Sequence, residues 1–332
     1  MSGDFARKPV LVTGADGFIG SHLVERLLAE GARVRAFVFY NSFGRWGWLD
    51  DCPADLRDHL EIFPGDIRDP LRVREAVRSQ EIVFHLASLV AIPYSYHAPS
   101  SYVETNVLGA LNVLNACREV SCRRMVHTST SEVYGTARYV PIDERHPLQA
   151  QSPYSASKIG ADMLAESFYR SFGVPVAIIR PFNTYGPRQS ARAVIPTIVT
   201  QVLDGVKTLR LGALTPTRDF NYVKDTVSGF LAVSRADGAI GRVINVGSGR
   251  EVAIGELART IMGIVGREAE IVCEEERLRP EQSEVQRLVC NNALARELTG
   301  WGPQHSLEQG LQETCAWVKD HLDHYRPGEY LL

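Results

Sequence analysis

Short apolar runs alternate with amphipathic stretches through the first half of the chain. Compact apolar runs are typical of buried strands, whereas apolar residues spaced three and four apart are typical of helices. The pattern predicts strands at 10–13, 34–39, 62–63, 82–86, 124–128 and 176–179, and helices at 18–30, 71–78, 102–120 and 154–172. Strands separated by helices of this length predict βαβ units, and therefore a parallel sheet with helices on both faces.

The rhythm loosens after about residue 180, where prolines and glycines often interrupt the chain. Helical spacing returns at 253–265, 293–298 and 307–324. We therefore predict an α/β protein with a Rossmann-type doubly wound parallel sheet in residues 1–180 and a smaller α/β domain in residues 181–332. The second domain is expected to cover the ligand crevice of the sheet, with a segment at about 222–250 returning to the first domain.

Composition narrows the kinds of ligand that the chain can bind. Its 332 residues include 36 Lys and Arg against 39 Asp and Glu, a formal net charge of -3, and the sequence pI is about 6.3. A nucleic-acid-binding domain is expected above about pI 9, so we expect no nucleic-acid partner. Any anionic ligand must be held by local arginines, lysines or backbone N–H groups.

The sequence contains no pattern typical of a membrane span or of a metal site. No apolar run approaches the roughly 18 residues that span a bilayer, and the N-terminus carries no apolar signal region. The six cysteines are dispersed without the spacing of a zinc site. We therefore expect no membrane span, no metal site, and buried free thiols in a reducing cytoplasm.

A glycine-rich segment, Gly14-Ala15-Asp16-Gly17-Phe18-Ile19-Gly20, follows the first expected strand and opens the first expected helix. Small residues at this GxxGxxG spacing let the backbone turn tightly and approach a pyrophosphate, whose charge is stabilised at the helix N-terminus. A plain glycine-rich turn is the alternative. The strand–helix context favours dinucleotide binding.

The end of the second strand leaves the choice of dinucleotide open. An NAD-binding protein usually has Asp or Glu there, which bonds the ribose 2′-hydroxyl. This chain has Phe39-Tyr40-Asn41-Ser42-Phe43-Gly44-Arg45, without a carboxylate, and Arg33, Arg35 and Arg45 are the nearby cations. Asp66, which ends the third strand, has two interpretations: a partner of the adenine amino group, or a turn or helix cap.

Tyr154 and Lys158 are four residues apart in an expected helix, so they share one face. A free tyrosine has a pKa of about 10 and is a poor base at neutral pH. A nearby cation, either Lys158 or a nicotinamide ring, is expected to lower that pKa. Tyr154 could then take the proton of a substrate hydroxyl while hydride leaves its carbon. A surface Tyr–Lys pair is the alternative, but the glycine segment accompanies this pair.

With these motifs in place, the chain resembles the extended short-chain dehydrogenases/reductases of the nucleotide-sugar epimerase/dehydratase group. Further marks of the resemblance are His85-Leu86-Ala87-Ser88, Asn106, Thr128-Ser129-Thr130 and Arg180-Pro181-Phe182-Asn183-Thr184-Tyr185-Gly186-Pro187-Arg188. The resemblance implies NAD, or alternatively NADP, as cofactor and a nucleotide-diphosphate sugar as substrate. It also implies a homodimer that packs through the helices at about 102–120 and 154–172.

The resemblance also assigns residues to each ligand. It implies cofactor contacts from Gly14, Asp16, Gly17, Phe18, Ile19, Gly20, Tyr40, Asn41, Asp66, Ile67, Leu86, Ala87, Thr128, Tyr154 and Lys158. It implies that the nucleotide-sugar is held by Asn183, Arg192, Arg218 and Arg279. Guanidinium groups suit phosphate oxygens because they donate hydrogen bonds in pairs.

Within that group, Thr130-Ser131-Glu132-Val133-Tyr134-Gly135 resembles the 4,6-dehydratases, whereas simple 4-epimerases usually have small residues in place of the glutamate. The resemblance implies oxidation at C4 with Tyr154 as the base, which makes the C5 proton acidic. Glu132 would take that proton and return it to the departing C6 hydroxyl, and hydride then returns to C6. Thr130 would bond the 4-hydroxyl, and Ser131 replaces the usual Asp. A solvent-facing loop carboxylate is the alternative for Glu132.

Three longer strings, 40–49, 91–96 and 189–196, are similar to N-acetylhexosamine 4,6-dehydratases of the legionaminic-acid type, which implies UDP- or GDP-N-acetylglucosamine as substrate. A 4-epimerase is an alternative if Glu132 points away from C5. A UDP-glucuronate decarboxylase is another, although it usually has Tyr-Asp-Glu-Gly-Lys where this chain has Tyr154-Ser155-Ala156-Ser157-Lys158. A non-catalytic, cofactor-sensing protein of the same fold is a third, although it would be expected to lose the Tyr or the Lys.

Overall fold

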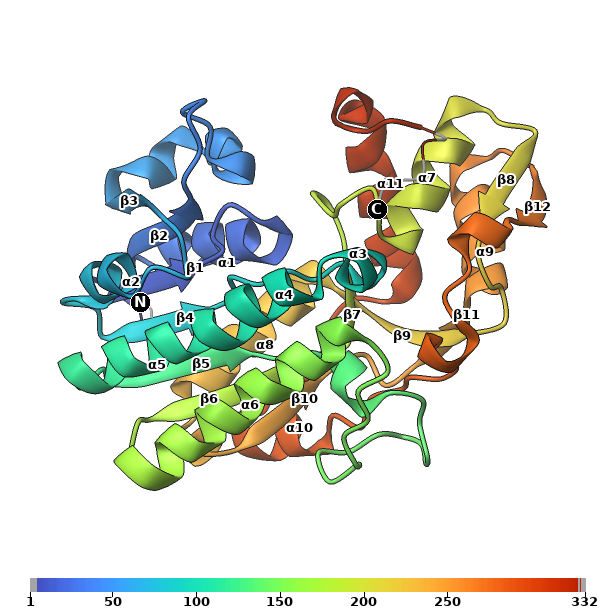
Figure 1. The fold of residues 1–332 in the computed structure, drawn as a ribbon. Coiled ribbons are helices and arrows are strands. Elements are labelled where there is room, and N and C mark those ends of the chain that lie inside the picture. Colours follow the sequence, from blue (N-terminus) through green and yellow to red (C-terminus); the bar gives the residue numbers. More distant parts are fainter. Residues whose placement is uncertain (1–4, 328, 330–332) are drawn as a thin grey trace.

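A parallel sheet lies between two layers of helices, with the C-terminal elements beside it (Figure 1). The computed structural model describes residues 5–327 and 329. The strand order of the sheet is β10-β6-β5-β4-β1-β2-β3, and every neighbouring pair is parallel. The seven strands are β1 (Pro9–Thr13), β2 (Arg33–Phe39), β3 (Leu60–Gly65), β4 (Ile82–His85), β5 (Arg124–Thr128), β6 (Val176–Pro181) and β10 (Val243–Val246). The predicted doubly wound parallel sheet is confirmed, and β3 is longer than predicted.

One face of the sheet is covered by α2 (Pro70–Val77), α5 (Gly109–Val120) and α6 (Pro153–Phe172). Strand residues such as Leu11 and Val83 are buried against these helices. Their neighbours along each strand point to the opposite face, because side chains of a strand alternate. Burial on both faces explains why the strands appear in the sequence as continuous apolar runs.

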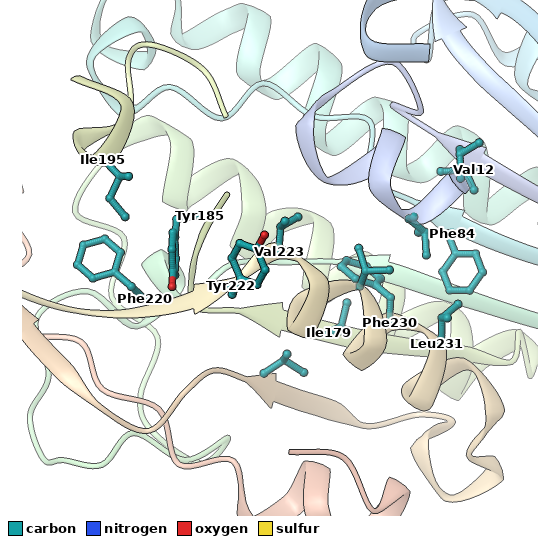
Figure 2. Close-up of a cluster of buried hydrophobic side chains, with 14 of the residues drawn as sticks. Val12, Phe84, Ile179, Tyr185, Ile195, Phe220, Tyr222, Val223, Phe230 and Leu231 are labelled. Atoms are coloured by element: carbon teal, nitrogen blue, oxygen red, sulfur yellow. The ribbon is translucent and has the colours of Figure 1, made fainter. Parts of the chain in front are cut away.

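The other face is covered by α1 (Phe18–Ala29) and α8 (Val223–Arg235), and its core continues into the C-terminal part of the chain. Figure 2 shows Phe84 of the sheet and Phe230 of α8 in the same cluster as Tyr185, Ile195 and Phe220. The ring centroids of Phe84 and Phe230 are 6.4 Å apart. The two parts of the molecule therefore share one hydrophobic core.

The C-terminal part contains two small sheets and several helices. One sheet has the order β11-β9-β7, and the other pairs β12 with β8. These elements are β7 (Asn183–Tyr185), β8 (Thr208–Leu211), β9 (Thr217–Tyr222), β11 (Glu251–Ala253), β12 (Glu270–Cys273), α7 (Val194–Asp204), α9 (Ile254–Val265), α10 (Ala293–Thr299) and α11 (Leu307–Asp320). Between them, α8 and β10 belong to the layers of the parallel sheet. The domain boundary at residue 180 stays a prediction.

The helix predicted at 102–120 is not one regular α-helix. Two short helices, α3 (Ile92–His97) and α4 (Pro99–Tyr102), precede a π-helical turn, Val103–Leu108, and only then does α5 begin. Asn106 lies in this turn, where its side-chain oxygen accepts from Leu89 N at 2.8 Å and its amide donates to Ser157 Oγ at 2.9 Å. The wider turn thus coincides with an amide that ties two other segments together, and such turns are common near functional sites.

The C-terminal helix also ends earlier than predicted. The sequence pattern favours a helix over 307–324, but α11 ends at Asp320 and a 3-10 turn, Leu322–His324, follows. His321 lies at the helix end, where its ring nitrogen bonds the Trp317 carbonyl at 2.8 Å and its ring stacks on the indole at 4.1 Å. That side-chain contact occupies a carbonyl in the last turn of the helix.

The described residues also bear on the membrane, metal and thiol expectations. Within residues 5–327 and 329, no helix is both long and apolar enough to cross a membrane. The same part of the chain has no group of three or more His, Cys, Asp or Glu placed to hold a metal ion. All six cysteines are free, and Cys273 is exposed, so the expectation of burial is wrong for that thiol.

Candidate active site

The glycine segment lies between β1 and α1, at the carboxyl end of the sheet strands. Gly14 has a φ of +67°, and a Cβ there would lie 2.8 Å from the Ala87 nitrogen. A Cβ on Gly20 would lie 2.1 Å from the Gly14 carbonyl oxygen. Side chains are therefore excluded at both positions. Because α1 begins after Gly17 without a side-chain cap, its first turn offers backbone N–H groups to an anion.

A cavity of about 780 Å³ opens beside this segment, where the strand order reverses between β1 and β4. Ligands of doubly wound sheets bind at this position. Most of the residues predicted to bind a cofactor or to act in catalysis line the cavity: Gly14, Asp16, Gly17, Phe18, Ile19, Gly20, Asp66, Ile67, Leu86, Ala87, Thr128, Thr130, Ser131, Glu132, Tyr154 and Lys158.

Tyr40 and Asn41 differ from the other predicted cofactor residues, because neither lines this cavity. The side chain of Tyr40 is 65% exposed. The amide of Asn41 donates to the Arg45 carbonyl at 2.6 Å, so it is used within its own loop. Phe39 and Arg68 line the cavity although the sequence pattern does not single them out.

Tyr154 and Lys158 lie one turn apart on α6, and both are buried beside the cavity. The helix begins after Ser152, whose side chain forms a capping box with Ser155. Lys158 Nζ donates a hydrogen bond to the Thr128 carbonyl at 2.5 Å, which fixes the ammonium group at the end of β5. Burial lowers the pKa of Lys158 to about 8.

The electrostatics of Tyr154 differ from the expectation drawn from the sequence. Burial raises the pKa of its phenol, and a hydrogen bond with Thr130 only partly opposes this. The carboxylates of Glu132 and Asp162 raise the same pKa further. The cation expected to lower this pKa was either Lys158 or a nicotinamide ring. Burial has the largest effect on Tyr154 and also disfavours the charged form of Lys158, so lowering by a nicotinamide ring stays a prediction. A cation brought by a ligand would lower this pKa again.

A buried polar network that sequence reasoning missed lies beneath these residues. Asp162, one turn beyond Lys158, accepts hydrogen bonds from Ser129 Oγ at 2.6 Å and from Arg180 Nη2 at 2.9 Å. His127 Nε2 lies 3.3 Å from the other carboxylate oxygen. Ser129 directly follows Thr128, whose carbonyl accepts from Lys158. By binding Ser129, Asp162 therefore also holds that carbonyl in place. The one signal in the sequence is the four-residue spacing from Lys158 to Asp162.

A second cavity, of about 440 Å³, is lined by Asn183, Arg192, Arg218 and Arg279, the residues predicted to hold the nucleotide-sugar. Arg218 Nη2 donates to Glu284 Oε1 at 2.9 Å, and Arg279 Nη1 lies 3.6 Å from the same oxygen. Two guanidinium groups thus share one carboxylate, so this trio keeps one positive charge that suits a phosphate. Sequence reasoning missed Glu284, whose place is set by chain folding rather than by local spacing.

The two cavities meet at the predicted chemistry, because Thr130, Glu132, Tyr154 and Asn183 line both of them. Glu132 lies on a 3-10 turn, Ser131–Tyr134, and its backbone nitrogen donates to Thr130 Oγ1 at 3.2 Å. Burial raises the pKa of Tyr154 and lowers that of Arg218, and the nearby Glu132 carboxylate adds an upward effect on both. A carboxylate, a phenol and a hydroxyl are therefore grouped where ligands in the two cavities would touch.

Comparisons with known proteins agree with this arrangement. A family model described as GDP-mannose 4,6 dehydratase matches residues 11–314. A UDP-glucose 4-epimerase from Mycolicibacterium smegmatis is 34% identical, over 93% of this chain and 98% of that protein. A dTDP-glucose 4,6-dehydratase from Streptomyces antibioticus is 31% identical, over 96% of this chain and 94% of that protein. The structure of the dTDP-glucose 4,6-dehydratase DesIV from Streptomyces venezuelae, with NAD bound, has a TM-score of 0.86 at 31% identity, covering 96% and 98% of the two chains.

A dinucleotide-type cavity that ends at a Tyr–Lys pair is typical of the short-chain dehydrogenases/reductases, and the second cavity in the C-terminal part makes this protein an extended member of that class. The match over residues 11–314 is more specific. The chain belongs to the GDP-mannose 4,6-dehydratase family, whose relatives named above are nucleotide-sugar epimerases and dehydratases.

Proposed function

We propose that this protein is a nucleotide-sugar 4,6-dehydratase that uses NAD and acts on UDP- or GDP-N-acetylglucosamine. The observation that carries the proposal is the carboxylate of Glu132, which lines both cavities beside Tyr154. Elimination of water across C5 and C6 needs a base for the C5 proton. Epimerisation at C4 leaves C5 untouched and needs no such group.

The residues of the larger cavity fit NAD. The glycine segment and the uncapped first turn of α1 suit a pyrophosphate. Thr128 Oγ1 is buried and has no hydrogen-bond partner among the described residues, so it can bond a polar group of the cofactor. Asp66 would meet the adenine. When bound, NAD accepts and later returns a hydride, and its nicotinamide ring brings the cation that Tyr154 needs.

The proton transfers fall to residues of this chain. Tyr154 Oη takes the proton of the 4-hydroxyl, which Thr130 orients, as C4 becomes a ketone. Glu132 then removes the acidified C5 proton and gives it to the C6 oxygen, so the C6–O bond breaks, water leaves and a double bond joins C5 and C6. The hydride taken from C4 would return to C6, and C5 would regain a proton equivalent to the one that Tyr154 took up, which gives the 4-keto-6-deoxy sugar. Lys158 contributes its positive charge from beneath. Ser131 cannot supply a proton as a carboxylic acid does, so we assign both proton steps at C5 and C6 to Glu132.

The nucleotide-diphosphate portion of the substrate belongs to the second cavity in this proposal. Arg218 and Arg279 are already held by Glu284, so their guanidinium groups are positioned before a diphosphate arrives. Asn183 Oδ1 is buried without a hydrogen-bond partner among the described residues, which supports a role in bonding the substrate. Arg192 lines the same cavity.

Product analysis tests the reaction. The purified protein is incubated with UDP-, GDP-, CDP- and dTDP-sugars, N-acetylglucosamine derivatives included, and the products are weighed by mass spectrometry. A 4,6-dehydratase gives a 4-keto-6-deoxy sugar that is about 18 Da lighter, the mass of one water. Unchanged mass with inversion at C4 would establish the second candidate, a 4-epimerase, which one relative named above represents. Carbon dioxide release from UDP-glucuronate would establish a decarboxylase.

The variant Glu132→Gln tests the assignment of the base. Glutamine keeps the size of the side chain but cannot take the C5 proton, so we expect oxidation at C4 followed by a stall. Reduced cofactor should then accumulate and absorb near 340 nm, an approximate property of the reduced nicotinamide ring. Turnover of the variant at the original rate would refute the role of Glu132.

We also propose that the protein is a homodimer, as its family resemblance implies. Four large apolar side chains of the π-helical turn and α6 are exposed to solvent: Val103, Leu108, Met163 and Phe172. An apolar group of this kind is typical of a protein–protein contact. A cytoplasmic location also stays a prediction, and the free cysteines are consistent with it.

A further inference from the structure

A carboxylate does stand at the end of β2, although the strand itself supplies none. Asp16 Oδ2 accepts a hydrogen bond from the backbone nitrogen of Phe39 at 3.3 Å, and Phe39 is the last residue of β2. Asp16 and Phe39 both line the larger cavity. The end of the second strand is where a dinucleotide-binding sheet presents an acidic side chain to the ribose 2′-hydroxyl. Here the glycine segment brings the acid to that place.

The position of Asp16 is fixed from the far side as well. Its carbonyl oxygen accepts a hydrogen bond from Trp48 N at 3.2 Å. Trp48 in turn packs edge-to-face on Trp317 of α11, with ring centroids 5.3 Å apart. Asp16 is therefore held between the β2 end and a loop that α11 supports, so its carboxylate has a defined direction.

The charges around this place disfavour a phosphate. Among the described residues that line the larger cavity, the cations are Arg68 and Lys158. Arg68 is paired with Asp66 at 2.6 Å and with Glu104 at 3.3 Å, while Lys158 is held at the end of β5. Burial raises the pKa of Asp16, so this place already disfavours negative charge. A second anion beside it would be less favourable still.

We propose that Asp16 selects NAD over NADP. Its carboxylate accepts a hydrogen bond from the ribose 2′-hydroxyl of NAD and repels the 2′-phosphate that NADP carries at the same atom. This inference rests on the dinucleotide binding in the proposed function and adds the residue that decides between the two cofactors. This chain has Tyr40 where an NAD-binding protein usually has Asp or Glu, and Asp16 supplies the missing carboxylate instead.

Binding calorimetry on the full chain tests the proposal with NAD and NADP as separate probes. We expect the wild-type protein to bind NAD more tightly. Asp16→Asn keeps the side-chain size and an acceptor for Phe39 N but removes the charge. We expect its ratio of NAD to NADP affinity to fall by at least about tenfold, since hydrogen bonds to charged groups are worth that much or more. Asp16→Ser should shift the ratio in the same direction. Agreement between the two variants would attribute the shift to the lost carboxylate rather than to one particular replacement.

Asp66→Asn is the matched control, because the adenine that Asp66 is predicted to meet is common to both dinucleotides. It should weaken NAD and NADP alike and leave the ratio unchanged. A wild-type preference for NADP, or a ratio unchanged in both Asp16 variants, would overturn the proposal. If neither dinucleotide binds the wild-type chain, the cofactor part of the proposed function fails and this inference fails with it. If NAD binds selectively but no nucleotide-sugar loses water, the dehydratase assignment fails and the role of Asp16 stands.

Discussion

The hydroxyl of Tyr154 is the group on which C4 oxidation depends in the proposed reaction. Tyr154→Phe removes that hydroxyl and keeps the ring, so we expect turnover to fall by about 10²–10⁴-fold, the usual range for loss of a general base. Thermal unfolding should change little. Turnover is measured by product mass, with the cofactor absorbance near 340 nm as a second readout, an approximate property of the reduced ring.

The matched control for this variant is Tyr102→Phe. Tyr102 is buried, its ring packs against Tyr154 with centroids 6.2 Å apart, and its hydroxyl donates to the Ala91 carbonyl. It lines neither cavity. We expect this change to leave turnover within a few-fold of the wild type. Equal rates for Tyr154→Phe and Tyr102→Phe would remove Tyr154 from the mechanism.

The ionisation of Lys158 should give the proposed activity a pH dependence. Burial lowers the pKa of this lysine to about 8, and the negative charge of Asp162 opposes that lowering. The ammonium is therefore lost as pH rises through about 8, and we expect kcat to decline there on the alkaline side. The neighbouring His85 and His127 have pKa values lowered by burial, so they stay neutral in that range.

Asp162→Asn sharpens this prediction because it removes the opposing charge. The alkaline decline should then move to lower pH, while at pH 6 the variant keeps more of its activity than at pH 8. Profiles of kcat between about pH 6 and 10 provide the measurement. A decline at the same pH in both proteins would show that Lys158 does not set it.

Sequence reasoning works at the residue scale wherever the chemistry is local along the chain. Tyr154 and Lys158 are four residues apart on one helix, and Thr130 and Glu132 lie in one short turn, so the local sequence alone predicts both pairs. Glu284 reaches Arg218 because the distant segment that contains Arg287 pairs with Thr217 at the start of β9. The raised pKa of Tyr154 depends on burial, which spacing cannot reveal.

At the scale of elements, α6 is joined to β6 by the buried pair of Asp162 and Arg180. Both side chains are almost fully buried. Asp162→Ala leaves the Arg180 guanidinium without its anion, and breaking such a pair costs about 3–5 kcal/mol of unfolding free energy. Urea unfolding measures the loss.

The pair formed by Arg124 and Asp237 provides the comparison, because its arginine is also buried but its aspartate is 92% exposed. Water replaces an exposed carboxylate easily, so Asp237→Ala should change the unfolding free energy far less than Asp162→Ala. Equal losses from the two substitutions would mean that burial of the Asp162 carboxylate contributes nothing of its own.

Elements with strong periodicity were predictable because the spacing of their apolar residues matches their burial. The strands of the parallel sheet are buried on both faces and appear as apolar runs, and the buried leucines and valine of α1 recur at helical spacing. The π-helical turn at Val103–Leu108 was not predictable, because it coincides with bonds from Asn106 to Leu89 and Ser157. Those partners are distant in sequence, so no local pattern announces the turn.

At the scale of the whole molecule, the C-terminal part is fastened to the α1 side of the parallel sheet by two contacts. Arg188, which follows β7, forms an ion pair with Glu25 of α1 at 2.8 Å. Trp317 of α11 packs on Trp48, whose backbone bonds Asp16. Together with the shared core (Figure 2), these contacts hold the second cavity against the first. The proposed reaction needs that fixed relation, because in it the substrate and the cofactor meet at Tyr154.

The homodimer is the last prediction at this scale. Met163 lies on α6, is 45% exposed and belongs to the apolar group predicted to meet a second copy. Met163→Glu would place a carboxylate in that apolar contact, where an unpaired charge is strongly disfavoured. We expect sedimentation velocity to show a dimer for the wild type and mainly a monomer for this variant.

Leu71→Glu is the control for the dimer, since Leu71 is 71% exposed on α2, outside the helices predicted to pair. That variant should remain a dimer and thereby show that added negative charge alone does not separate the chains. A monomeric wild-type protein, or a Met163→Glu variant as dimeric as Leu71→Glu, would refute this interface. The sequence could not distinguish Met163 from a core residue, because an apolar side chain on a helix looks the same whether its partner is its own sheet or a second chain.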